Sequence, residues 1–154
     1  MASYDGPLGI VLRNAKYTGQ MPLMYALGRF MAAVAKEELS NEYDGIIHVP
    51  TGRFRKLKRG FDQAEILAIC LSNATKIKRY TSLRRIDPSE QSKRLIKERR
   101  NSRNRFKGVE LYKNRILLVD DVCTTGNTLQ QCAQELLCNG IKEVHTLSLL
   151  SCQI

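Results

Sequence analysis

The sequence "ILLVDDVCTTGNTL", residues 116–129, decides the fold. An apolar run leads directly into the adjacent acids Asp120 and Asp121, and a loop rich in threonine with one glycine follows. A short apolar run that ends in polar turn residues predicts a buried strand over 115–119. Residues 126–137 have helical spacing, with Gly140 placed as a stop. The stretch therefore predicts a strand, a loop over 120–128 and a helix.

Similar patterns lie on both sides of this stretch. They predict helices over 21–39 and from Asp62 onward, where Glu65 follows as a capping partner, and further strands over 45–50 and 143–150. Residues 1–20 give no readable pattern. Alternating strands and helices predict an α/β fold with a mostly parallel central sheet flanked by helices, in one domain over 1–154.

Composition narrows the class of protein. Of the 154 residues, 43% are hydrophobic and 26% charged, which is typical of a globular domain. No apolar run has the roughly 18 residues that a membrane span needs, and no signal peptide is evident, so we expect a cytoplasmic protein. The five cysteines include no C-x-x-C pair, which argues against a disulfide framework or a zinc site.

The net charge of +10 is concentrated in two segments. Residues 53–59 (RFRKLKR) hold five Lys or Arg and no acid, and residues 84–107 hold ten against three acids. Such segments are either solvated loops or binding surfaces for phosphates or a nucleic-acid backbone. Because both flank a loop of phosphate-binding type, we favour a polyanionic partner.

The 120–128 loop predicts a site for a phosphorylated sugar. Ligands of open α/β sheets bind beyond the carboxyl ends of the strands, and a helix N-terminus with free N–H groups attracts phosphate. Carboxylates repel phosphate, but they accept hydrogen bonds from sugar hydroxyls and help to hold Mg²⁺. Phosphate on the loop and a diol on the acids together describe a ribose 5-phosphate. Walker and dinucleotide-binding glycine motifs are absent from the sequence.

These residues resemble a known family. "ILLVDDVCTTGNTL" is similar to the motif of type I phosphoribosyltransferases that binds phosphoribosyl pyrophosphate (PRPP). "VPTGRFRKLKRGFDQAEILA" (49–68) resembles the ComF family of competence-associated, phosphoribosyltransferase-like proteins in its R-G-F-[ND]-Q-A-x-x-L-A element. Gln91 with "RRNSRNRF" (99–106) and, more weakly, "KYTGQ" (16–20) agree with that family. The cysteine-rich zinc ribbon that many ComF proteins carry has no counterpart here, so this is either a member without the ribbon or a sequence from which the ribbon has been removed.

The resemblance implies a set of site residues. Asp120 and Asp121 would bind the ribose 2- and 3-hydroxyls, with Mg²⁺ held through the ribose or water. The 5-phosphate would lie on Thr124, Thr125, Gly126, Asn127 and Thr128. The pyrophosphate would lie near Thr51, Gly52, Arg53 and Arg59. Residues 84–107 would form a lid that excludes water, with contacts from Gln91, Arg99, Arg100 and Asn101.

Two functions stay open at this point. The resemblance implies either a Mg²⁺-dependent glycosyltransferase that moves ribose 5-phosphate from PRPP to a nitrogen acceptor, or a non-catalytic module that handles single-stranded DNA during DNA uptake together with competence-machinery proteins. A nucleobase-salvage enzyme is less favoured, because we expect no C-terminal hood for the acceptor base and residues 1–20 show no base-reading motif. A PRPP-sensing regulator is also less favoured.

Other reactive residues receive plainer interpretations. We interpret His48 and His145 as structural and Cys123 as a packing residue. Because only 6% of the residues are aromatic, the sequence favours an electrostatic groove over a stacking platform for single strands.

Overall fold

The computed structural model describes residues 2–39, 43–86, 106–108 and 113–152. Its main sheet has five parallel strands in the order β1-β7-β6-β2-β3. The strands of this sheet are β1 (Ala2–Ser3), β2 (Gly45–His48), β3 (Arg79–Tyr80), β6 (Arg115–Cys123) and β7 (Glu143–Ser151). The predicted α/β fold with a mostly parallel sheet is confirmed.

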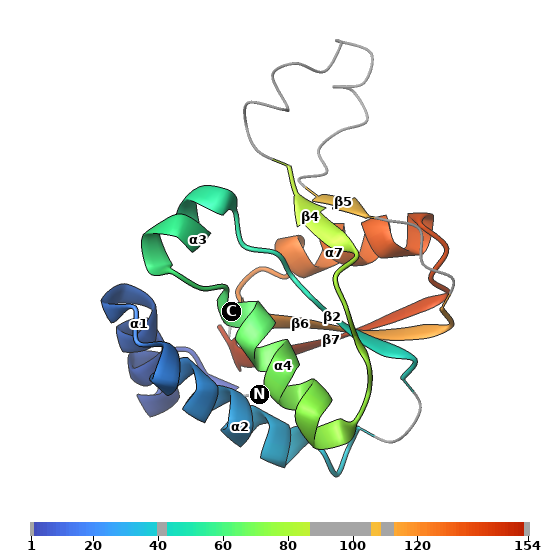
Figure 1. Cartoon of the computed structure of the whole chain (residues 1–154). Helices are drawn as coiled ribbons and strands as arrows, with labels where there is room; N and C mark the ends of the chain where they lie inside the picture. The colour runs from blue at the N-terminus through green and yellow to red at the C-terminus, as the bar shows by residue number, and fades with distance from the viewer. Residues whose placement is uncertain (1, 40–42, 87–105, 109–112, 153–154) are drawn as a thin grey trace.

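Five helices are described around this sheet: α1 (Pro7–Thr18), α2 (Met21–Ala35), α3 (Arg53–Arg59), α4 (Gln63–Thr75) and α7 (Asn127–Cys138). Figure 1 shows α1, α2 and α4 gathered on one side of the sheet and α7 on the other. Two hydrophobic clusters match these layers. Ile46, Leu117 and Val119 pack with α1, α2 and α4, whereas Ile47 and Leu118 pack with α7. Both faces of the sheet are buried, as is usual for parallel strands.

Several predicted boundaries were wrong. Strand β6 does not end at Val119; it continues through both aspartates to Cys123, because β7 pairs with it as far as Ser151. The helix expected to reach residue 39 ends at Ala35. Residues 53–59, for which no helix was predicted, form a short helix. Helix α1, in the unreadable first twenty residues, begins at Pro7 and ends before Gly19, whose φ is +66°.

Both ends of the segment expected to form a lid, residues 84–107, belong to strands. Strand β4 (Leu83–Arg85) pairs antiparallel with β5 (Phe106–Gly108), and the pair lies on the α7 side, where Leu83 and Phe106 are buried. Residues 87–105, with the proposed contacts of Gln91, Arg99, Arg100 and Asn101, lie outside the described residues. The lid therefore stays a prediction.

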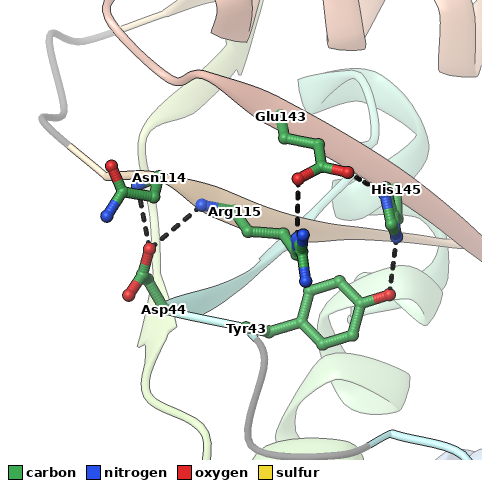
Figure 2. A network of polar contacts seen from close by, with 6 residues as sticks. All are labelled: Tyr43, Asp44, Asn114, Arg115, Glu143 and His145. Atoms are coloured by element: carbon green, nitrogen blue, oxygen red, sulfur yellow. Dashed lines mark hydrogen bonds and ion pairs between the residues drawn. The ribbon is translucent and has the colours of Figure 1, made fainter.

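The amino ends of the central strands carry a polar network (Figure 2). Asp44 Oδ2 accepts hydrogen bonds from the backbone N–H groups of Asn114, at 2.8 Å, and Arg115, at 3.0 Å. Glu143 binds Arg115 Nε at 2.6 Å and His145 Nε2 at 2.7 Å, and His145 Nδ1 shares a 2.8 Å hydrogen bond with the Tyr43 hydroxyl. These contacts join the starts of β2, β6 and β7.

No helix in the described parts of the chain is long and apolar enough to cross a membrane.

Candidate phosphoribosyl site

A cleft of about 170 Å³ opens at the carboxyl ends of β2 and β6. We call it the site cleft. Asp120, Asp121 and Thr128 line it from β6 and α7, and Thr51 from the end of β2. Its other polar and charged lining residues are Lys16, Arg55, Arg59, Gln63 and Arg85. The structure thus brings together Thr51, Arg59, Asp120, Asp121 and Thr128, which are far apart in the sequence.

The two acids have different electrostatic settings. The backbone N–H of Asp121 donates to Asp120 Oδ1 at 2.8 Å. Burial, and then repulsion from the Asp121 carboxylate, raise the pKa of Asp120 to about 7. Asp121 instead has a direct counter-ion, because Lys16 Nζ lies 2.6 Å from its Oδ2, with both side chains largely shielded from solvent. One acid of the pair therefore titrates near neutral pH, and the other is held by a cation.

Lys16 was missed by the sequence analysis as a site residue. It lies in α1, within the weak "KYTGQ" element, and a lone lysine in an amphipathic helix gives no signal of its position in space. Helix α1 carries it over the end of β6, where it also lowers the pKa of Asp120 through its charge.

The loop between β6 and α7 turns at Gly126 and leads into the N-terminus of the helix. Gly126 adopts φ +75°, a conformation that favours glycine, and precedes the first helical residue, Asn127. None of the side chains that the structure describes caps this helix, and a backbone hydrogen bond runs from Gln130 N–H to the Gly126 carbonyl. Thr124, Thr125 and Asn127 are exposed beside this turn and do not line the site cleft. An uncapped N-terminus of this kind can bind a phosphate.

Asp62 fixes the turn that follows β2 through hydrogen bonds. Its Oδ2 accepts the Thr51 backbone N–H at 2.8 Å, and its Oδ1 accepts the Glu65 N–H at 3.4 Å. The predicted capping of α4 by Asp62 is confirmed, and the same buried carboxylate also fixes Thr51. Gly52 precedes α3, near the side chain of Arg85. Arg53 lines a neighbouring cleft rather than the site cleft.

Gln63 is a second residue missed by the sequence analysis. Its side chain is only 2% exposed and lines the site cleft. Oε1 accepts a hydrogen bond from Arg59 Nη1 at 3.2 Å, but the buried Nε2 has no partner among the described residues. A buried donor without an acceptor is costly, so this amide is suited to an oxygen of a ligand or water.

The remaining candidates agree with their structural interpretations. His48 is buried in β2, and burial lowers its pKa. Cys123 packs against the cluster on the α7 face, and His145 belongs to the polar network at the opposite end of the sheet.

The donor set suits a hard cation that a substrate helps to bind. Within the described residues, no cluster of three His, Cys, Asp or Glu side chains could hold a metal ion. Mg²⁺ is commonly held by one or two carboxylates, water and substrate phosphates, and Asp120 and Asp121 supply two such carboxylates.

Comparisons with known proteins identify the family of the chain. Residues 57–152 match the phosphoribosyl transferase domain family. Competence protein F of Haemophilus influenzae is 30% identical over 95% of this chain and 69% of its own length, and competence protein ComFC of Bacillus subtilis is 28% identical over 90% and 57%. The chain thus spans just over half of the Bacillus relative.

Solved structures show the same fold. Glutamine PRPP amidotransferase of Bacillus subtilis has a TM-score of 0.58 at 23% identity, covering 82% of this chain and 26% of that one. UMP synthase of Leishmania donovani has a TM-score of 0.52 at 18% identity, covering 92% and 24%. The chain matches only about a quarter of each enzyme, and the likeness concerns the fold. The chain has the type I phosphoribosyltransferase fold and belongs to the phosphoribosyl transferase domain family, within the ComF group.

Proposed function

We propose that the site cleft binds PRPP together with Mg²⁺ and transfers its ribose 5-phosphate to a nitrogen acceptor. The observation that carries this proposal is the separation of charge within one cleft. Two adjacent carboxylates lie on the β6 side, while Arg55, Arg59 and Arg85 line the cleft with Gln63, whose Nε2 has no partner among the described residues. PRPP carries a diol for the acids and a pyrophosphate for the bases.

Each part of PRPP has a matching group. Asp120 and Asp121 accept hydrogen bonds from the ribose hydroxyls, and the uncapped N-terminus of α7 with residues 124–128 takes the 5-phosphate. Thr51 and Arg59 line the side of the cleft that we assign to the pyrophosphate, where Gln63 Nε2 adds a donor. Gly52 and Arg53 follow Thr51 at the start of α3, and Arg53 would reach the pyrophosphate from the neighbouring cleft.

The transfer needs charge stabilisation more than proton chemistry. The acceptor nitrogen forms a bond to C1 with its lone pair, and the electrons of the breaking C1–O bond leave with pyrophosphate. Arginines near the leaving group stabilise its added negative charge, and Asp121 is suited to support the positive charge that develops at the ribose. Bound Mg²⁺ supplies further stabilisation of the pyrophosphate.

The binding step is tested by thermal shift with PRPP, ribose 5-phosphate and pyrophosphate, each with Mg²⁺. We expect PRPP to raise the unfolding midpoint more than either fragment at equal concentration, because it contacts both sides of the cleft. An equal shift from pyrophosphate alone would contradict the diol assignment. Release of pyrophosphate from PRPP in the presence of a nitrogen acceptor tests transfer separately.

We place this activity in DNA uptake, because the similar proteins of Haemophilus and Bacillus are named for competence. A strain that lacks the gene should lose transformation with external DNA and regain it with the wild-type copy. Restoration by Asp121→Asn as well would separate competence from the phosphoribosyl site.

A further inference from the structure

Lys16 lines the site cleft, but the proposed function gives it no role. It lies in the last turn of α1, and its Nζ is 2.6 Å from Asp121 Oδ2. The two side chains are only 18% and 16% exposed, so salt and water screen this ion pair less than they screen a pair on the surface. The protein therefore holds the Asp121 carboxylate with a cation of its own.

The ion pair occupies a carboxylate oxygen that a divalent cation would need. Proteins bind Mg²⁺ through carboxylate oxygens, and Asp121 Oδ2 already contacts the Lys16 ammonium. An ammonium and a divalent cation on the same carboxylate would repel each other strongly, because a partly buried site screens charges weakly. A metal ion therefore binds Asp121 far more readily once Lys16 has left it.

The surroundings of Lys16 give its side chain room to move. Besides the site cleft, it lines a second cleft, of about 360 Å³, between α1 and α3, and Figure 1 shows these two helices beside each other. A lysine carries its charge on a flexible four-carbon stem. Arg55 and Arg59 line both clefts with it, so a phosphate group that reaches these arginines also attracts the Lys16 ammonium.

We propose that Lys16 is a displaceable counter-ion of the site. In the free protein it neutralises Asp121 and excludes a divalent cation from that carboxylate. When substrate binds, Lys16 Nζ moves to a phosphate oxygen, and Asp121 is released for the ribose hydroxyls and the metal ion. Lys16 thereby makes metal binding depend on substrate binding. The movement to a phosphate rests on the proposed function, whereas the exclusion of the cation rests on the ion pair alone.

The first test is metal binding without substrate, measured by electron paramagnetic resonance with Mn²⁺ as the probe. Lys16→Gln should bind Mn²⁺ about tenfold more tightly than the wild type, because the competing charge is gone. Lys16→Arg keeps the charge and should bind as weakly as the wild type. The gain should disappear when Lys16→Gln is combined with Asp121→Asn, which places the metal on this carboxylate.

Lys58→Gln is the matched control for net charge. It removes an equal charge from the lining of the second cleft and keeps the pair of Lys16 with Asp121. Circular dichroism checks that each variant is folded, and Lys16→Met, which keeps an aliphatic stem, replaces Lys16→Gln if the latter does not fold. Equal Mn²⁺ affinity in the wild type and the neutral Lys16 variant, or an equal gain in Lys58→Gln, would overturn the inference.

The second test uses the reciprocity of linked binding. Because Lys16→Gln accepts the metal without substrate, the factor by which Mg²⁺ strengthens PRPP binding should be about tenfold smaller in the variant than in the wild type, as measured by calorimetry. PRPP binding that Mg²⁺ strengthens equally in both proteins would leave the proposed function intact and overturn the role of Lys16. Absence of PRPP binding to either protein would instead refute the proposed function, and with it the movement of Lys16 to a phosphate.

Discussion

The two ends of the parallel sheet hold acids in opposite settings. At the amino end, Asp44 and Glu143 each accept two hydrogen bonds, and the pKa of each is lowered, mainly by hydrogen bonds from backbone N–H groups to Asp44 and from Arg115 to Glu143 (Figure 2). At the carboxyl end, Asp120 lies next to Asp121, and its pKa is raised to about 7. The amino-end acids have their partners within the fold, whereas the raised pKa of Asp120 supports the carboxyl-end pair as a candidate site.

The largest expected effect follows removal of one carboxyl-end charge. Asp121→Asn should weaken Mg²⁺-dependent PRPP binding about 100-fold, because charged hydrogen bonds to the diol are lost and the counter-ion Lys16 is left unpaired. Calorimetry measures the affinity, and circular dichroism checks that the fold is intact. Unchanged affinity in this variant would refute the diol assignment.

Gln63→Leu, also at the carboxyl end of the sheet, should have different effects on PRPP binding and on stability. The substitution removes a buried amide donor that has no partner among the described residues, together with the hydrogen bond that Oε1 accepts from Arg59, so we expect the unfolding midpoint to stay nearly level. PRPP affinity should fall about tenfold through the lost hydrogen bond to a charged oxygen. A lower midpoint with full affinity would show that the amide serves packing alone.

The raised pKa of Asp120 predicts a pH dependence of binding. PRPP affinity should rise about tenfold between pH 6 and pH 8 as this carboxyl ionises around pH 7. Because the folded-state pKa lies above the unfolded value of 3.8, the stabilising contribution is full below pH 3.8 and is lost as the pH rises through 7. That loss is at most about 4 kcal/mol.

Asp120→Asn is the control for both effects. The variant has no titrating carboxyl at position 120, so any pH dependence that remains comes from the ionisation of PRPP. In this variant, the free energy of unfolding should fall less as the pH rises toward 8. A pH profile of affinity identical to that of the wild type would assign the titration to the ligand.

Lys16→Gln should cause a smaller change. Because the lysine charge lowers the pKa of Asp120, its removal should move the midpoint of the affinity profile to higher pH. Calorimetry at half-unit pH steps measures this shift. Lys142→Gln, at the amino end of the sheet, serves as the control. If PRPP affinity had the same pH dependence in both variants, the shift would not come from the position of Lys16 beside the acids.

The smallest effect on binding is expected at the amino end. Asp44→Asn should leave PRPP affinity unchanged and lower the unfolding midpoint by a few degrees at neutral pH. Since the folded-state pKa of Asp44 is depressed, its contribution is present above pH 3.8 and is lost as the pH falls through the lower folded value. Thermal melts at pH 3 and pH 7 should therefore differ less in the variant than in the wild type.

Much of the fold could be predicted from the sequence, because the patterns that indicate its strands and helices are local. Apolar runs predicted β2, β6 and β7, and the Asp62–Glu65 spacing predicted the start of α4. The end of β6 was wrong because β7 supplies backbone partners beyond Val119, and no local pattern records that pairing. Helix α3 was missed because a basic heptapeptide without burial has no hydrophobic period.

Part of the candidate site could also be predicted from the sequence, because some of its residues form a local motif. Asp120, Asp121 and the threonine loop lie in one contiguous motif, so sequence reasoning could assemble them. Lys16 and Gln63 enter the site cleft only through tertiary packing of α1 and α4. Their roles depend on an ion pair and on an unpartnered amide, which residue types alone do not reveal.

The most direct test of the central claim is a calorimetric titration of PRPP into the wild-type protein, with and without Mg²⁺. The arrangement of the carboxyl-end acids predicts saturable binding at one site per chain that Mg²⁺ strengthens. Absence of saturable binding with Mg²⁺ present would contradict a phosphoribosyl site at the end of β6.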